Sequence, residues 1–159
     1  MNADINAITE QLSGNRLLRD VNEVAKFEDA LQAFNEQEDI NLIPNLCEGF
    51  DDGTQHYEVT FGLVHAIESL YHDDTKEYFN KIFLLVIEKD VMLPHAKEWL
   101  EILIIRTLND QGATESLITE VNSAEDHTKE ILAEITDKLI KEDKEQFESN
   151  GPKLLEAIR

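Results

Sequence analysis

The sequence predicts an all-α protein whose helices form antiparallel hairpins stacked into a HEAT-like α-α superhelix. Apolar residues recur mostly at intervals of three and four, the spacing of one helix face, and no segment reads convincingly as a strand. Only six glycines and three prolines interrupt the 159 residues. Two similar segments, Leu42-Ile43-Pro44-Asn45 and Met92-Leu93-Pro94-His95, each resemble a helix start. Such an echo is typical of solenoids built from repeated hairpins.

Four helices are expected in the N-terminal half. The first apolar stripe stops at Ser13-Gly14, and the third is ended by the turn sequence Asp51-Asp52-Gly53. The second alternates spacings of three and four and is a clear amphipathic helix. The four stripes lie in residues 5–12, 24–34, 40–50 and 59–70.

The C-terminal half continues the helical pattern. Asp74 is the predicted N-cap of a helix over 75–89, and Pro94 is predicted to open the next helix. A short helix carries Leu117 to Val121, and Ser123 resembles the cap of a long charged helix that extends toward Phe147. Asn150-Gly151-Pro152 is expected to end that helix before the last turns. The uneven helix lengths favour a stack over a symmetric bundle, within a single domain of residues 1–159.

The chain is strongly acidic, with 14 Lys and Arg against 34 Asp and Glu and a formal net charge of −20 at pH 7. Proteins that bind nucleic-acid backbones need a basic surface to displace counterions, so this class is excluded. An anionic membrane surface would repel the chain for the same reason. Apolar residues make up 42% of the sequence, which is enough for a core and argues against disorder.

A cytoplasmic location is expected. The only cysteine, Cys47, lies in an apolar stretch with no disulfide partner in the chain, and we interpret it as an inert buried thiol and not a reactive one. The first four residues, Met1-Asn2-Ala3-Asp4, lack the basic and apolar parts of a secretory signal. The longest apolar run, from Ile82 to Ile87, is too short to span a bilayer.

The negative charge is unevenly distributed along the chain. Residues 27–75, which we call the base-free stretch, contain no Lys or Arg. Their acids are Glu28, Asp29, Glu36, Glu38, Asp39, Glu48, Asp51, Asp52, Glu58, Glu68, Asp73 and Asp74. One interpretation is an ordinary solvated surface. The other is a negative field that speeds association with a basic partner, at the cost of self-repulsion that added salt should relieve.

Acidic pairs follow the ends of two predicted helices, Asp51-Asp52 and Asp73-Asp74. In an antiparallel hairpin these ends lie on opposite sides, whereas an offset helix would bring them to one edge. Tyr57 and Tyr71 lie beside the pairs and are typical interface anchors, although capping the core is an equal alternative. The predicted partner-binding residues are Glu48, Asp51, Asp52, Tyr57, Glu58, Tyr71, Asp73 and Asp74.

No catalytic, cofactor-binding or metal-binding residue is assigned. His65 and His72 are seven residues apart, about 10.5 Å along a helix, which is too far for one zinc ion. A partly buried His65 with a polar partner is the simpler interpretation. The sequence contains no EF-hand loop, phosphate-binding glycine loop, nucleophile elbow or metalloprotease signature.

Four segments between Asn41 and Asp110 belong together. They are Phe50-Asp51-Asp52, Glu58-Val59-Thr60-Phe61-Gly62-Leu63-Val64-His65-Ala66-Ile67-Glu68, Leu93-Pro94-His95-Ala96-Lys97-Glu98-Trp99 and Arg106-Thr107-Leu108-Asn109. In this order they resemble the Immunity protein 30 family of bacterial polymorphic toxin systems, the class that includes contact-dependent inhibition. The resemblance implies a mostly helical protein, made beside a toxin gene, that protects its producer by binding the toxin.

Residues that match the family pattern can serve the fold. Gly62 is expected to allow close approach of two helices, and Trp99 and Arg106 to pack as a pair on one face. Trp99 is expected in the core, with a place in the interface as the alternative.

Charge and resemblance lead to one expectation: an immunity protein, not an enzyme, that occludes a basic, nuclease-type toxin stoichiometrically and needs no cofactor. Its carboxylates would accept hydrogen bonds from Arg and Lys, and Tyr57 and Tyr71 would be the desolvated anchors. The alternatives are a HEAT-like adaptor with several partners and a metal-dependent enzyme using His65, His72 and Asp73.

Overall fold

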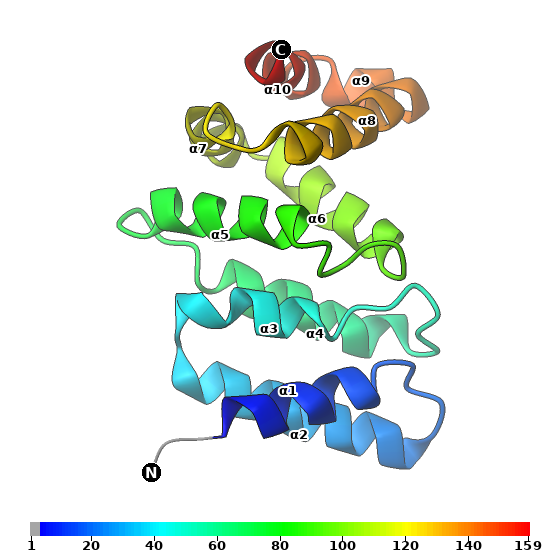
Figure 1. The fold of residues 1–159 in the computed structure, drawn as a ribbon. Coiled ribbons are helices and arrows are strands. Elements are labelled where there is room, and N and C mark those ends of the chain that lie inside the picture. Colours follow the sequence, from blue (N-terminus) through cyan, green and yellow to red (C-terminus); the bar gives the residue numbers. More distant parts are fainter. Residues whose placement is uncertain (1–3) are drawn as a thin grey trace.

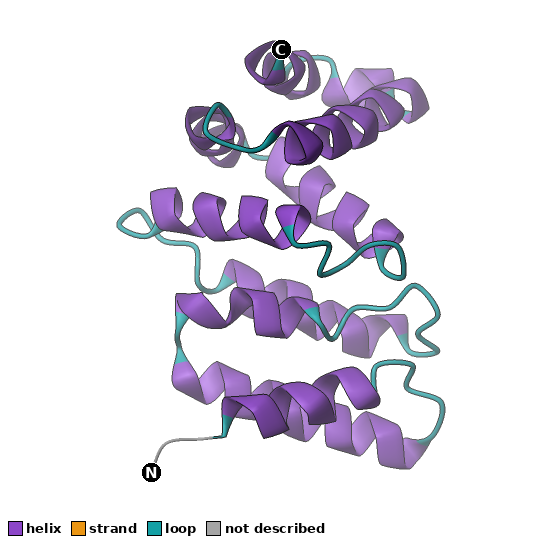
Figure 2. Ribbon diagram, in the orientation of Figure 1, coloured by secondary structure: helices purple, strands orange, loops and turns teal. Residues whose placement is uncertain are grey.

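The computed structural model describes residues 4–159, and these residues form helices and no strand, as the sequence predicts (Figure 2). Residues 1–3, at which the sequence shows no secretory signal, lie outside the described part. No helix in residues 4–159 is long and apolar enough to cross a membrane. The elements in chain order are α1 (Ile5–Gly14), α2 (Val21–Gln37), the 3-10 helix η1 (Ile40–Leu42), α3 (Ile43–Cys47), α4 (Tyr57–Glu68), α5 (Lys76–Glu88), α6 (Lys97–Leu108), α7 (Gln111–Val121), α8 (Asp126–Glu142), α9 (Lys144–Phe147) and α10 (Asn150–Ile158).

The helices are stacked in tiers from the N-terminus at one end to the C-terminus at the other (Figure 1). α1, α3 and α5 lie above one another in one row, with α2 and α4 beside them, and α1 contacts α3, α3 contacts α5, and α2 contacts α4. α7 and α8 pack on α5, and α10 closes the far end by packing on α7 and α8. Stacked hairpins are therefore present, whereas the HEAT-like superhelix stays a prediction.

The connections between helices alternate between two sides of the stack (Figure 1). Loops 15–20, 48–56 and 89–96 lie on the right of the view, and we call this side the turn edge. Segments 38–39 and 69–75 lie on the left, and we call this side the link edge. Each edge therefore collects residues that are far apart in the sequence.

One continuous core holds the tiers together. Trp99, Phe27 and Phe50 are its largest fully buried side chains, and the rings of Phe50 and Trp99 lie 5.4 Å apart between centroids. Two glycines mark tight contacts: a Cβ on Gly49 would meet Leu12 at 2.8 Å, and one on Gly62 would meet Leu31 at 3.1 Å. The Gly62 contact agrees with the close helix approach predicted for this residue.

Two helix starts differ from the prediction. The N-cap of α5 is Thr75 and not Asp74. The Thr75 hydroxyl accepts a hydrogen bond from the His72 N–H at 2.9 Å and donates one to the Leu70 carbonyl at 3.0 Å, so it closes the link before the helix begins. α6 begins at Lys97, three residues after Pro94, so Pro94 lies in the preceding turn and does not open the helix.

The C-terminal boundaries also differ from the prediction. α8 is capped at Glu125, without a side-chain hydrogen bond, and not at Ser123. Phe147 lies in the separate helix α9, and Asn150 opens α10 and does not end the long helix. Pro152 is accommodated because the first turn of a helix leaves its N–H groups unpaired in any case.

Candidate partner-binding surface

The acidic pair on the turn edge is occupied by contacts within the chain. Arg16 Nε donates to Asp51 Oδ2 at 3.0 Å, and the Gly53 N–H donates to Asp51 Oδ1 at 2.8 Å. The contact with Arg16 connects the loop between α1 and α2 to the loop between α3 and α4. The Asp51 carboxylate therefore has both an opposite charge and a backbone donor before any partner arrives.

Asp52 caps a helix that begins 45 residues later in the chain. Its carboxylate accepts the N–H groups of Glu98 at 3.2 Å and of Trp99 at 3.4 Å, in the first turn of α6. The N-cap residue itself, Ala96, supplies no side-chain acceptor. A carboxylate at this end is also favoured by the helix dipole, so Asp52 stabilises the fold across two tiers.

The remaining predicted residues of the turn edge are more accessible. Tyr57 is 54% exposed and stacks on Trp99, with ring centroids 4.5 Å apart. Glu58 is exposed and lies 3.6 Å from His56 Nδ1, and Glu48 is exposed. Trp99 itself is only 2% exposed and donates through Nε1 to the Asp51 carbonyl, so it belongs to the core.

Residues of the family-like pattern meet along the seam between α4 and α6. The Arg106 guanidinium lies 5.3 Å from the Phe61 ring centroid and makes two hydrogen bonds to Glu68, of 2.8 and 2.7 Å. The hydrogen bonds and charge of Glu68 raise the pKa of the Arg106 side chain above its ordinary value. Trp99 also contacts Phe61, at 6.1 Å between ring centroids. Trp99 and Arg106, which were predicted to pack as a pair, therefore both pack against the Phe61 ring.

His65 lies on the same seam and is exposed, not partly buried as predicted. Its ring packs edge-on against Phe61 at 5.1 Å. The i, i+4 spacing of Tyr57, Phe61 and His65 places all three on one helix face. This spacing is visible in the sequence and is the signal by which the cluster could have been predicted.

The acidic residues of the link edge have no such internal partners. Asp73 and Asp74 are exposed and make no side-chain hydrogen bond or ion pair within residues 4–159. Tyr71 is half-buried, with its ring edge-on to Phe79 at 5.1 Å. These three residues therefore lie together at the end of α4 that is opposite to Tyr57.

α4 separates the two groups of predicted residues. Its twelve residues span about 18 Å at 1.5 Å per residue. Asp51 and Asp52 lie at one end of the hairpin of α3 and α4, and Asp73 and Asp74 at the other, so the two pairs do not share an edge.

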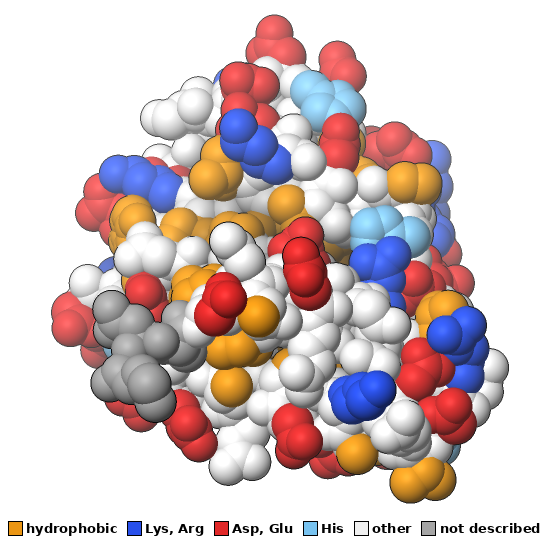
Figure 3. Space-filling view, turned by 60° about the horizontal axis from the view of Figure 1, so that its bottom comes forward, with side chains coloured by type: hydrophobic (Ala, Val, Ile, Leu, Met, Phe, Trp, Pro, Cys, Tyr) orange, Lys and Arg blue, Asp and Glu red, His pale blue; other side chains and the backbone are white. Residues whose placement is uncertain are grey.

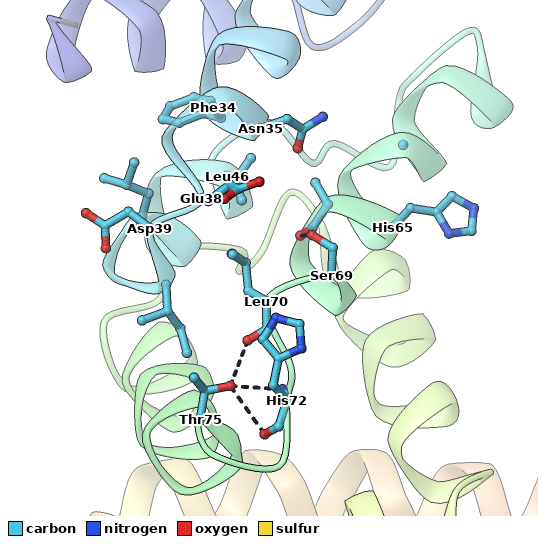
Figure 4. Close-up of a pocket in the computed structure, with 14 residues that line it drawn as sticks. Phe34, Asn35, Glu38, Asp39, Leu46, His65, Ser69, Leu70, His72 and Thr75 are labelled. Atoms are coloured by element: carbon cyan, nitrogen blue, oxygen red, sulfur yellow. Dashed lines mark hydrogen bonds between the residues drawn. The ribbon is translucent and has the colours of Figure 1, made fainter. Parts of the chain in front are cut away.

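A cavity of about 660 Å³ opens between the end of α2, η1 and α4 (Figure 4). Glu38 and Asp39 line it from segment 38–39, and His72 and Thr75 from segment 69–75. Its apolar part comes from Phe34, Ile40, Leu42, Leu46, Ala66 and Leu70. All the lining residues belong to the base-free stretch, so none is Lys or Arg.

Glu38 and Asp39 were not among the predicted partner-binding residues, although both were recognised as acids without neighbouring bases. Glu38 is the C-cap of α2 in the left-handed region, at φ 48°, and its side chain has no hydrogen-bond or ion-pair partner within residues 4–159. One carboxylate oxygen of Asp39 already has a partner, because Oδ1 accepts a hydrogen bond from the Asn41 N–H at 2.9 Å. Sequence patterns could not indicate the cavity, since its walls come from α2, η1, α3, α4 and the two segments of the link edge.

The remaining acids are spread over the surface. Viewed from the end that carries α1 and α2, acidic side chains are scattered over the visible face, with several basic side chains between them (Figure 3). Of the twelve acids in the base-free stretch, only Asp51 and Glu68 pair with an arginine in the described residues, and Glu58 lies near a histidine. No group of three or more metal-ligating side chains occurs in residues 4–159.

Cys47 is buried in α3, as predicted. Burial raises the pKa of its thiol, with a further contribution from the Glu48 charge.

A family model described as Immunity protein 30 matches residues 14–117. The matched region runs from the end of α1 into α7 and includes both edges, the α4–α6 seam and the cavity. No match was found among curated proteins or among solved structures.

Proposed function

Because the chain belongs to the Immunity protein 30 family, we propose that it protects its producer by binding a cognate bacterial toxin in the cytoplasm and occluding it stoichiometrically. No turnover is required for this action. The proposed partner is a toxin domain with a basic surface, like the surface with which a nuclease binds nucleic acid. An acidic protein can cover such a surface and compete with the phosphate backbone for it.

The observation that carries the proposal is the lack of basic partners for most acids of the base-free stretch. The formal net charge is −20, and nine of the twelve acids in this stretch have no basic partner in residues 4–159: Glu28, Asp29, Glu36, Glu38, Asp39, Glu48, Asp52, Asp73 and Asp74. A carboxylate without a basic partner keeps its negative field for another molecule, although Glu36, Asp39 and Asp52 accept hydrogen bonds from neutral groups of the chain.

The link edge is the proposed centre of the contact. Asp73 and Asp74 are fully available there, and Tyr71 lies beside them with an apolar ring and a polar hydroxyl. Tyr57, Glu58 and Glu48 form a second, peripheral contact at the turn edge. Asp51 and Asp52 add to the field of the protein, but their hydrogen bonds serve the fold.

The test is co-expression with the C-terminal domain of the large secreted protein encoded by the neighbouring gene. We expect that toxin domain to stop growth by itself, growth to be restored by this chain, and the purified pair to form a complex of fixed stoichiometry in light scattering.

The test variant carries Asp73→Lys and Asp74→Lys, and it should retain its helical circular dichroism but protect less well. Binding of several host proteins without growth protection would contradict the proposal and support the adaptor alternative. Protection without a stable complex would contradict occlusion.

A further inference from the structure

We propose that the cavity between α2, η1 and α4 is the receptor for a single arginine side chain of the toxin, inserted at the centre of the contact. This inference rests on the proposed function and specifies the partner chemistry at the link edge. It follows from the charge at the mouth of the cavity, the apolar lining, and the lack of any Lys or Arg among the residues that line it.

The mouth of the cavity carries an available carboxylate. Glu38 has no hydrogen-bond or ion-pair partner in the described residues, and Asp39 keeps one oxygen without a protein donor. In Figure 4 the Glu38 side chain lies between Asp39 and Ser69, whereas His65 points away from the cavity. The nearest base along the chain, Lys76, lies beyond Thr75 and does not line the cavity.

The lining suits a long side chain with a polar head. Leu42, Leu46 and Leu70 present apolar surface, on which the methylene groups of an arginine can be buried while its head stays at the acidic mouth. A guanidinium is planar, more weakly hydrated than an ammonium and able to donate two parallel hydrogen bonds to one carboxylate. Arginine is therefore favoured over lysine as the inserted residue.

The cavity has room for an inserted side chain. Its volume is about 660 Å³, and pockets of about 300–1,000 Å³ enclose whole small molecules. A bare metal ion would need converging ligands, and no cluster of three ligating side chains occurs in residues 4–159. A phosphate or other anion would be repelled by Glu38 and Asp39.

The test uses the purified toxin domain of the neighbouring gene as the probe and measures Kd and the association rate by stopped flow. Glu38→Lys should weaken binding by about 30-fold or more, because it places a like charge at a partly desolvated contact. The matched control is Glu28→Lys, which makes the same charge change at an exposed position on α2 outside the cavity. It should weaken binding by no more than about 3-fold, through the long-range field alone.

A second variant separates insertion from electrostatic steering. Ser69→Phe fills the cavity without changing the charge, and we expect it to raise the dissociation rate about 10-fold or more while the association rate changes little. If Ser69→Phe does not fold, as judged by circular dichroism, His72→Phe fills the cavity from segment 69–75. On the toxin side, one Arg→Ala substitution should be non-additive with Glu38→Lys in a double-mutant cycle.

The outcomes distinguish the two proposals. If the wild-type chain binds and neutralises the toxin but Glu38→Lys and the filling variants bind as tightly as wild type, the cavity inference is wrong and the proposed function stands. If Glu38→Lys weakens binding and the filling variants do not, the charge acts by steering alone and insertion is refuted. If the wild-type chain does not bind the toxin at all, the proposed function fails.

Discussion

The turn edge and the link edge carry similar acidic sequences but use them differently. At the turn edge, Asp51 pairs with Arg16 and Asp52 caps α6, so the carboxylates connect tiers of the stack. At the link edge, Asp73 and Asp74 have no partner in residues 4–159. A count of acidic residues treats these positions alike. What distinguishes them is whether the fold already satisfies the charge, and that decides which edge is available to a toxin.

The largest expected effect is the loss of stability on replacing Trp99, the buried side chain around which the turn edge is packed. Trp99→Ala should lower the free energy of unfolding by about 3–5 kcal/mol, because it removes a buried ring that contacts Phe50, Tyr57 and Phe61. Urea denaturation gives the value, and Trp99→Phe is the control that keeps most of the volume. A loss below about 1 kcal/mol for Trp99→Ala would mean that the turn edge is not organised around this residue.

The next effect compares one acid from each edge. Asp52→Ala should cost about 0.5–2 kcal/mol, the usual cost of losing a helix cap. Glu38→Ala should change stability by no more than about 0.5 kcal/mol, since its carboxylate has no partner in the described residues. Both values come from chemical denaturation under identical conditions. Equal losses for the two variants would remove the distinction between the edges.

A smaller effect concerns the self-repulsion of unpaired acids. Raising NaCl from 50 mM to 500 mM should increase Tm by about 2–4 °C, the shift that 1 kcal/mol gives in a domain of this length. The variant with Asp73→Asn and Asp74→Asn should gain less from salt than the wild type. Differential scanning calorimetry measures both, and a salt gain that does not change in the variant would show that these two acids do not contribute to the repulsion.

The smallest expected effect is a change in Tm at a pair of acids away from both edges, Glu88 and Glu125. It shows what a contact between two carboxyl groups contributes to stability elsewhere in the chain. A hydrogen bond with Glu88, together with the charge of Glu88, raises the pKa of Glu125 above its ordinary value. A raised pKa means that the fold disfavours the charged carboxylate, so this site contributes stability at low pH that is lost as pH rises through the folded pKa. Glu125→Gln should therefore raise Tm slightly at pH 7, and the difference should disappear below the pKa of Glu125.

Thermal melts of Glu125→Gln and wild type across this pH range provide the measurement. Glu88→Gln should give a similar gain, and the double variant little more than either one. A Tm gain that persists unchanged at acidic pH would show that the effect does not come from this carboxyl pair.

Most helices could be predicted because their apolar residues repeat within a single element. α2 and α4 were recognised from this spacing alone. The helix starts were harder, because some depend on residues far away in the chain. α6 has Ala96 at its N-cap and takes its acceptor from Asp52, so no local pattern marks where the helix begins. Pro94 was predicted to open this helix from a local preference, that of proline for the first turn, and the prediction was wrong because α6 begins at Lys97.

The candidate site could be predicted only in part. The base-free stretch and the position of Asp73 and Asp74 beside a helix end are evident in the sequence. The commitment of Asp51 to Arg16, 35 residues away, is not, since nothing local indicates which acid the fold will use. The cavity likewise depends on how α2, η1 and α4 are packed, and Glu38 gains its place there only through that packing.

The buried thiol of Cys47 allows the opening of α3, which lies between the two edges, to be followed by chemical labelling. It is the only thiol in the chain, and its burial and raised pKa leave almost no reactive thiolate in the folded state. The rate at which a maleimide reagent modifies the native protein thus reports how often α3 opens. A cysteine introduced at an exposed position of either edge would react much faster, so a fluorescent probe can be placed there without replacing the native residue.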